Sequence, residues 1–294
     1  MIFPDRGNGA GSEPVIKWSG SKRSVAPLLS RLFPPAERFI DPFVGGGAIL
    51  PFRSARASLA ADVVPELIEL WKLIQEQPAL VARQYENRWQ RLKQEGHTAY
   101  YDIRHRFNRQ RDPFDFLFLS RTCVNGLIRF NSQGDFNNSL HHTRSGIMPS
   151  RLAKIAESWS IALQGVVFQT TDYRETLSTA AQSDFVFLDP PYAGTRGRYR
   201  PGIFDVKEFF KELDRLNSAG VRWILTFDGS AGDRIYQGGL PESLYRHHLA
   251  MHTGNSPFCK VMDKNVESIT ESVYMNFDPA PAVLDLFPVP LPGD

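Results

Sequence analysis

The sequence predicts an α/β fold built on a parallel sheet, and three segments lead to this prediction. The segment 38–50 is typical of a short apolar strand that ends in an acid, followed by a glycine turn and a helix. The segment 57–62 is a second short strand, and a helical pattern follows it over 65–75. The segment 184–192 is an apolar run that ends in an acid and two prolines. Repeated strand and helix units of this kind form parallel sheets.

The strand at 184–188 is so continuously apolar that we expect it to be buried on both faces, at the middle of the sheet. A ligand site is expected at its carboxyl end. Downstream, 206–219 is amphipathic, 221–227 is a further strand, and 267–277 alternates between apolar and polar residues. These segments extend the sheet and close it with antiparallel pairing.

More than a hundred residues separate the second strand from the central one, far more than a crossover normally needs. We therefore expect an inserted segment, with helical patterns over 85–93 and 114–121 and a polar loop over 131–146. The tail, 279–294, contains five prolines and little periodicity, so it is predicted to be extended or disordered.

Composition places the chain in the ordinary globular range, with 42% hydrophobic and 22% charged residues. No apolar run reaches the roughly 20 residues that cross a bilayer, so no membrane partner is expected. The first 14 residues are polar and carry no secretory apolar region, which favours a cytoplasmic location. The two cysteines, Cys123 and Cys259, form neither a disulfide framework nor a metal-binding pair in sequence, so both are expected to be reduced and no metal is predicted.

Charge is unevenly distributed along the chain. The window 83–154 contains 13 Lys and Arg against 6 acids and has a net charge of +7, whereas the rest of the chain has −5. A basic segment of this kind suits a polyanion such as nucleic acid, because phosphate contacts dominate nucleic-acid affinity. A solvated helical face explains the same charge equally well.

The most specific motif is Asp189-Pro190-Pro191-Tyr192, which follows the central strand. The second proline has no N–H to donate, and the carbonyl of Pro190 is left as a free acceptor. The Asp189 carboxylate and this carbonyl could accept both hydrogens of an exocyclic amine while Tyr192 stacks on the base. A proline-stiffened turn with a capping Asp is the alternative.

A second motif, Asp41 to Ala48, contains three consecutive glycines but neither a dinucleotide-binding nor a triphosphate-binding pattern. It favours a compact ligand without phosphate that approaches the backbone closely, with Asp41 binding an ammonium group. Asp62, at the end of the second strand, could accept hydrogen bonds from ribose hydroxyls or could cap the next helix. The two acids together suggest a cofactor that contains adenosine.

The residues Lys17-Trp18-Ser19-Gly20-Ser21-Lys22-Arg23, Asp41 to Ala48, and Asp189 to Tyr192, in this order, resemble the motifs of the Dam-like (D12, α-class) DNA adenine-N6 methyltransferases. The likeness extends from about residue 15 to 277, and the segments 121–131 and 134–137 are similar to that family's recognition hairpin. The resemblance implies a Rossmann-like methyltransferase sheet that uses S-adenosylmethionine. It also implies an inserted, mainly helical target-recognition domain with a β-hairpin.

On this basis we expect a discontinuous catalytic domain at 1–65 and 148–278, a target-recognition domain at 66–147 and a Pro-rich tail at 279–294. The implied catalytic residues are Asp189, Pro190, Pro191 and Tyr192. The implied cofactor-binding residues are Lys17, Trp18, Gly20, Asp41, Phe43, Gly45, Gly46, Asp62, Asp172 and Asp189. The residues expected to bind double-stranded DNA are Lys22, Arg121, Asn125, Leu127, Arg129, Asn131, Asn137, Arg196 and Arg198, with Arg129 reading a guanine.

Three departures from the family pattern bear on these roles: Ser21 replaces a glycine, Val124 replaces a common aromatic, and 194–200 is unusually basic. The resemblance implies a site-specific adenine methyltransferase that flips its target base. It acts either in a restriction-modification system, beside a cognate restriction endonuclease, or as an orphan epigenetic methylase. Three other acceptors remain open: an RNA adenine, the N4 amine of cytosine and a protein glutamine. The alternative from another class is a DNA-binding regulator without catalysis.

Overall fold

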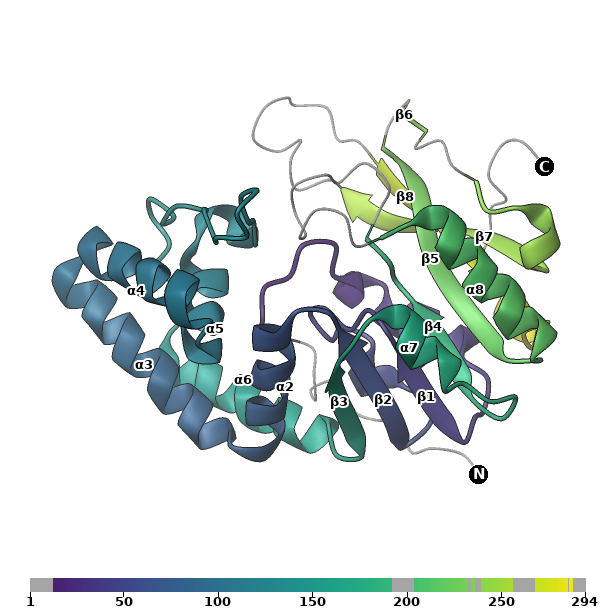
Figure 1. The fold of residues 1–294 in the computed structure, drawn as a ribbon, viewed down its shortest axis with the longest axis horizontal. Coiled ribbons are helices and arrows are strands. Elements are labelled where there is room, and N and C mark those ends of the chain that lie inside the picture. The colour runs from purple at the N-terminus through teal and green to yellow at the C-terminus, as the bar shows by residue number, and fades with distance from the viewer. Residues whose placement is uncertain are drawn as a thin grey trace.

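The computed structural model describes residues 13–191, 204–231, 234–235, 239–255, 268–284 and 286–287. One mixed sheet forms the centre of this part of the chain, with the order β3-β2-β1-β4-β5-β8-β7 and β6 paired to β5 (Figure 1). The first five strands in this order are parallel, and β8 is antiparallel to both β5 and β7. The predicted parallel sheet with antiparallel closure is confirmed. The strands are β1 Arg38–Asp41, β2 Ala57–Asp62, β3 Val166–Thr170, β4 Phe185–Leu188, β5 Arg222–Ala231, β6 Arg234–Ile235, β7 His247–Asn255 and β8 Ser268–Met275.

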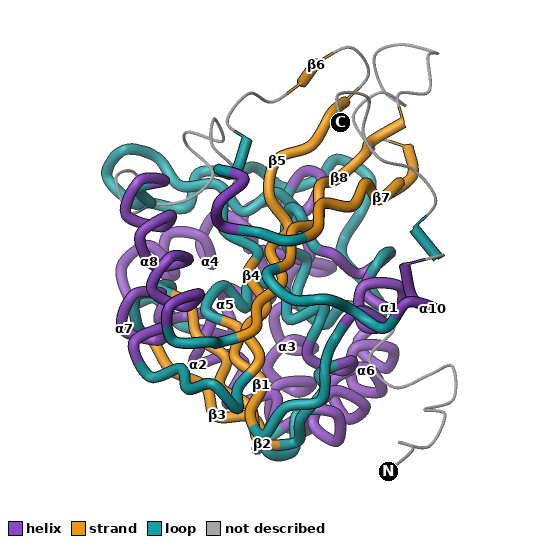
Figure 2. Tube along the Cα trace, turned by 90° about the vertical axis from the view of Figure 1, so that its right-hand side faces the viewer, coloured by secondary structure: helices purple, strands orange, loops and turns teal. Residues whose placement is uncertain are grey.

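Helices cover both faces of the sheet, which is seen nearly edge-on in Figure 2. The central strand β4 is buried throughout, as predicted, and its side chains alternate between two cores. Phe185 and Phe187 contribute to the core beneath α1, α2 and α6, whereas Val186 and Leu188 contribute to the core beneath α7 and α8. These helices are α1 Ala26–Leu29, α2 Pro65–Glu76, α6 Pro149–Ala162, α7 Tyr173–Ser178 and α8 Val206–Ser218.

Three more helices lie to one side of the sheet, between β2 and α6 in the chain: α3 Pro78–Glu95, α4 His97–Gln110 and α5 Pro113–Thr122 (Figure 1). α5 is the centre of this group, since it contacts α2, α3 and α4 and most of its side chains are buried. α2 contacts β2 and β3 as well as α5, so it connects the sheet to the helical group. The segment between β2 and α6 thus contains a packed group of helices, α3 to α5, which we call the helical insert.

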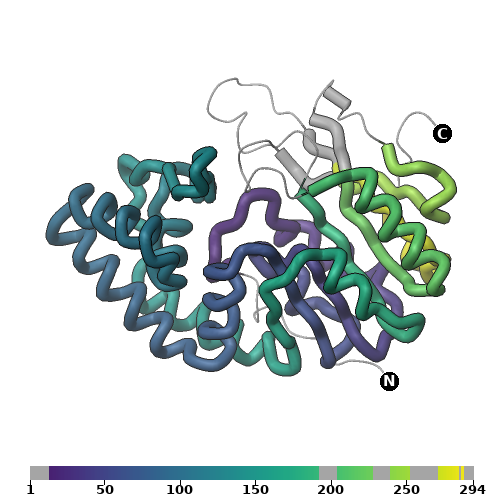
Figure 3. Tube along the Cα trace, viewed as in Figure 1, coloured from purple at the N-terminus to yellow at the C-terminus, as the bar shows by residue number. Residues whose placement is uncertain are grey.

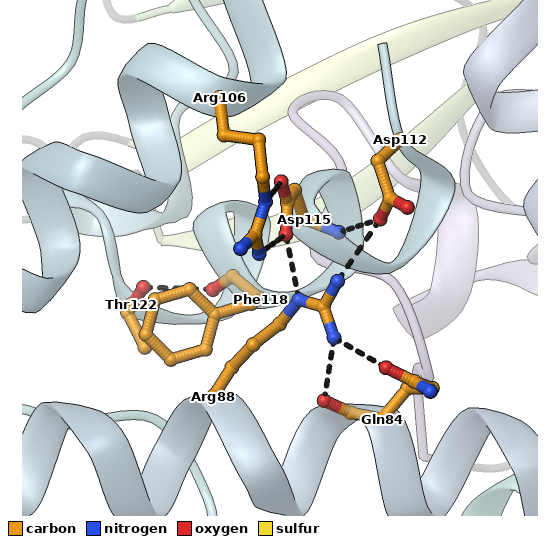
Figure 4. A network of polar contacts seen from close by, with 7 residues as sticks. All are labelled: Gln84, Arg88, Arg106, Asp112, Asp115, Phe118 and Thr122. Carbon is orange, nitrogen blue, oxygen red and sulfur yellow. Dashed lines mark hydrogen bonds and ion pairs between the residues drawn. The ribbon is translucent and has the colours of Figure 1, made fainter. Parts of the chain in front are cut away.

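A buried ion network fixes the three helices relative to one another (Figure 4). The side chain of Asp115, on α5, is fully buried and accepts hydrogen bonds from Arg88 of α3 and Arg106 of α4. Arg88 also binds Asp112, the residue that caps α5, and the side chain of Gln84. A buried carboxylate with two guanidinium partners is satisfied only when all three helices are in place.

Two predicted elements are wrong. No α-helix follows the glycine turn at 45–50: Gly45 and Gly47 have positive φ angles, and only a 3₁₀ turn at Leu50–Phe52 forms. The tail is not wholly extended, because Pro281–Leu284 form one helical turn, α10, and Phe287 is buried. No described helix has the length and apolar character needed to cross a membrane.

Candidate functional site

Three carboxylates lie at the carboxyl ends of neighbouring parallel strands. Asp41 ends β1, Asp62 ends β2, and Asp189 follows β4, so the topology brings them to one edge of the sheet, where a site was predicted. Burial raises the pKa of Asp41 well above its ordinary value, and the charges of Asp189 and Asp62 raise it further. Burial also raises the pKa of Asp62, to about 6. Such a cluster favours a cationic ligand.

The glycine turn is held by both of the acids that flank it. An Asp41 carboxylate oxygen accepts from the backbone N–H of Phe43 at 3.1 Å. The carboxylate of Asp62 accepts from the N–H of Gly45 at 3.2 Å and from that of Val64 at 3.1 Å. Asp62 therefore stabilises both the glycine turn and the start of α2, whose N-cap residue is Val64. Its remaining acceptor capacity is available to a ligand.

Trp18 packs on the glycine turn and explains why the turn needs glycine. A Cβ atom on Gly46 would lie 2.7 Å from the Trp18 Cβ atom, and one on Gly45 would lie 2.6 Å from the Trp18 Nε1 atom. The sequence predicted that a ligand approaches these glycines closely, but on the Cβ side of both of them the Trp18 side chain does so. The N-terminal segment reaches this position between the sheet and the helical insert (Figure 3). The Trp159 Nε1–H anchors it by donating to the carbonyl of Glu13 at 2.8 Å.

An aromatic group adjoins the glycine turn. Phe43 stacks on Tyr173 of α7 with ring centroids 5.4 Å apart, and it meets Phe204 and Phe209 edge to face. Asp172 lies beside this group but caps α7, accepting from the backbone N–H of Arg174, and also forms an ion pair with the Arg174 side chain. Asp172 therefore has a structural role at the start of α7, in addition to the cofactor contact expected of it.

The carboxylate of Asp189 is held by two buried donors. The Lys22 ammonium lies 2.8 Å from its Oδ1 atom, and the Thr226 hydroxyl of β5 donates to the same oxygen at 2.8 Å. Lys22 also lies 3.7 Å from Glu271 of β8. Lys22 was expected to contact DNA, whereas in this structure its side chain is only 2% exposed and its ammonium lies against Asp189. Sequence reasoning missed Thr226 and Glu271, although an acid within the alternating strand 267–277 was a usable signal.

The predicted hairpin is present, but only as two isolated antiparallel bridges. Phe130 pairs with Phe136 in one antiparallel bridge, Cys123 pairs with Leu140 in another, and no regular strand forms between them. The side chain of Asn131 accepts from the N–H groups of Gln133 and Asp135 and so shapes the tip of the turn. The tip therefore depends on Asn131 for its conformation.

The hairpin exposes two of the residues expected to read DNA. Asn125 and Arg129 are exposed, and Asn125 has a positive φ of 57°. The Arg129 Nε–H donates to the Asn137 side chain at 2.9 Å, so this bond does not use the two terminal guanidinium nitrogens. Leu127 and Asn137 are half-buried at its base. The hairpin thus presents a guanidinium with a fixed stem.

Arg121 differs from its predicted role as a DNA contact. It is 6% exposed at the end of α5, and burial lowers its pKa. The basic window is likewise not one free cationic face, because several of its arginines form internal ion pairs: Arg88, Arg91, Arg106, Arg111 and Arg151. The number of arginines in that segment therefore overstates the cations available to phosphates.

The remaining predicted residues fall into two groups. Lys17 is half-buried, with its side chain where a Cβ atom on Gly126 would stand, and Gly20 turns the chain at a φ of 78°. Pro190 is buried and Pro191 half-buried at the end of β4. Tyr192, Arg196, Arg198 and Cys259 lie outside the described residues. Cys123 is buried, and burial raises the pKa of its thiol to about 11, as suits a packing residue.

A comparison with known families identifies the family of this chain. Residues 18–222 match the D12 class N6 adenine-specific DNA methyltransferase family, and the chain belongs to that family. Its sheet is accordingly the Rossmann-like sheet of a methyltransferase.

Individual relatives carry related names. The retron Ec67 DNA adenine methylase of Escherichia coli is 28% identical over 287 residues, which cover 92% of this chain and 95% of that protein. The DNA N-6-adenine-methyltransferase of Escherichia phage P1 is 32% identical over 75% of this chain, which spans 30% of the phage protein. A DNA adenine methylase of Vibrio cholerae is 30% identical over 60% of this chain and 64% of its own length.

Proposed function

We propose that this protein transfers a methyl group from S-adenosylmethionine to the N6 amine of an adenine flipped out of double-stranded DNA. The observation that carries the proposal is the free side of the Asp189 carboxylate at the end of β4, in a chain of the N6 adenine-specific family. Among the described residues, both partners of this carboxylate bind its Oδ1 atom. The Oδ2 atom is left for the amine of the substrate.

The chemistry at the amine follows from two acceptors. The Asp189 carboxylate and the Pro190 carbonyl accept one amine hydrogen each, which favours a pyramidal nitrogen whose lone pair is free to attack. Tyr192 would stack on the flipped base, whose extrusion costs a few kcal/mol. Positioning and electrostatics supply most of the rate, because the reactive methyl group is brought by the cofactor.

The acidic edge of the sheet fits a cofactor with two positive groups. S-adenosylmethionine supplies a methyl group on a sulfonium centre and also carries an ammonium group. Asp41 is buried among like charges that raise its pKa, and a cation beside it would relieve that repulsion. Asp62 would accept from ribose hydroxyls, while Phe43 and Trp18 would border the ligand. Lys17, Gly20 and Asp172 complete the proposed contacts.

The hairpin and the helical insert form the proposed DNA-reading part. Arg129 would read a guanine edge, with Asn137 holding its guanidinium. Asn125, Leu127 and Asn131 would contact the duplex around the flipped base. Arg196 and Arg198 would add phosphate contacts.

The experiment is methyl transfer from labelled S-adenosylmethionine to unmethylated duplex DNA, with the modified nucleoside identified by mass spectrometry. The expected product is N6-methyladenine. Asp189→Ala is expected to lose transfer while binding cofactor nearly as well as the wild type. Label in N4-methylcytosine, label only in RNA, or normal turnover of Asp189→Ala would each refute the proposal.

A further inference from the structure

The Asp189 carboxylate is asymmetric in its contacts. Its Oδ1 atom receives the Lys22 ammonium at 2.8 Å and the Thr226 hydroxyl at 2.8 Å. Among the described residues, no hydrogen bond or ion pair reaches Oδ2, and the side chain is 21% exposed. Both donors therefore bind one oxygen, and the other oxygen has no partner among the described residues.

The two donors come from elements that are themselves fixed. Thr226 is fully buried on β5, next to β4, just before the register shift in the pairing of β5 with β8. Lys22 lies in a 3₁₀ turn, and its ammonium also donates to the carbonyl of Gly20 at 3.3 Å. Neither donor can follow a displaced carboxylate without disturbing a buried strand or the N-terminal segment that carries Trp18.

Glu271 completes the arrangement. It lies on β8 with its Oε2 atom 3.7 Å from the Lys22 ammonium, and that oxygen is buried without a hydrogen bond. Burial raises the pKa of Glu271, while the Lys22 charge lowers it. The Lys22 ammonium thus pairs with two acids, and it lies nearer to Asp189 than to Glu271.

We propose that Thr226 and Lys22 are positioning residues that fix the Oδ1 atom of Asp189 and so direct its Oδ2 atom at the target amine, with Glu271 holding Lys22 in place. This inference rests on the proposed function, since it assumes that Asp189 accepts from the amine. It assigns the ammonium of Lys22 to the interior of the site. Neither residue touches the substrate, so each acts only through Asp189.

The test compares three variants with the wild-type protein under single-turnover conditions. Thr226→Val removes the hydroxyl at nearly constant volume, Thr226→Ser keeps it, and Lys22→Met keeps the stem without the charge. Because a misplacement of about 1 Å can cost about 100-fold in rate, we expect Thr226→Val to lower the rate of transfer by about 10- to 100-fold. Lys22→Met is expected to lose at least as much, and Thr226→Ser to retain most of the rate. The dissociation constants for cofactor and DNA should change less than threefold.

A matched control removes another buried hydroxyl. The Ser58 hydroxyl donates to the carbonyl of Ala55 near the amino end of β2, whereas the site lies at the carboxyl ends of the strands. Ser58→Ala is expected to transfer methyl groups at the wild-type rate, and thermal melts identify any variant that fails to fold. If Thr226→Val fails to fold, the transfer rates of Thr226→Ser and Lys22→Met relative to the wild type still test the inference.

Failure of the positioning inference can be distinguished from failure of the proposed function. If the wild type transfers methyl groups, Asp189→Ala does not, and folded Thr226→Val and Lys22→Met keep the wild-type rate, the positioning inference is overturned while the proposed function stands. Equal losses in Thr226→Ser and Thr226→Val, or a loss confined to cofactor affinity, would also overturn it. If Asp189→Ala keeps its activity, the proposed function itself fails.

Discussion

Replacing Asp115 with alanine should destabilise the helical insert strongly. Its carboxylate is fully buried and accepts from the Nε–H of Arg88 at 2.6 Å and from the Nε–H of Arg106 at 2.7 Å. Removing one partner of a buried ion pair costs about 3–5 kcal/mol, because a charge is left uncompensated. Arg88 would keep Asp112 and Gln84, and Arg106 is 36% exposed and could be rehydrated. We therefore expect the lower end of the range, about 3 kcal/mol.

The assay is equilibrium unfolding in urea, followed by circular dichroism, with Glu95→Ala as the matched control. Glu95 pairs with Arg91 on the surface of α3, where both side chains are more than a third exposed, so its loss should cost about 0–1 kcal/mol. The reasoning on the buried network would be refuted if Asp115→Ala were within about 1 kcal/mol of the wild type, or if both variants lost the same amount.

Three further predictions concern the site. Asp62→Asn should weaken cofactor binding by about 1.5–3 kcal/mol in calorimetry, the value of a hydrogen bond to a charged group. Because the free protein holds the pKa of Asp62 near 6 and the ligand favours the ionised carboxylate, wild-type affinity should fall by up to about tenfold per unit as pH drops below 6. This dependence should be weaker in Asp62→Asn, and equal pH profiles would exclude Asp62 as its source. Arg129→Ala should relax discrimination at one position of the recognition site by about 1–3 kcal/mol with little change in salt dependence, whereas a uniform loss on all duplexes would assign Arg129 to a phosphate. Gly46→Ala should cost about 1–3 kcal/mol of unfolding free energy, because the added methyl meets the Trp18 Cβ atom; unchanged stability in urea would contradict this packing.

The strands that carry the site could be predicted from the sequence because each is a short apolar run ended by an acid. β3 and β7 could not be predicted in the same way. β3 is an edge strand with Val167 exposed, and β7 begins with two histidines, so neither shows clear alternation. By contrast, α6 places Leu152, Ile155 and Trp159 on one buried face at helical spacing, a signal that was present and missed.

The burial of two cationic side chains could not be predicted from the sequence. Lys22 and Arg121 are cations near motifs that suggest nucleic acid, and no local pattern distinguishes a buried cation from an exposed one. Lys22 is buried because β4 and β8 bring Asp189 and Glu271 to it from 167 and 249 residues away in the chain. Thr226 is an ordinary strand residue in the sequence, and its contact with Asp189 exists only because β4 and β5 are adjacent.

The central claim is tested most directly by the nucleoside formed when the purified protein acts on unmethylated duplex DNA with isotopically labelled S-adenosylmethionine. Mass spectrometry of the digested DNA should find the label in N6-methyladenine for the wild type and none above background for Asp189→Ala. Label in any other nucleoside, or equal label in the two proteins, would contradict the account.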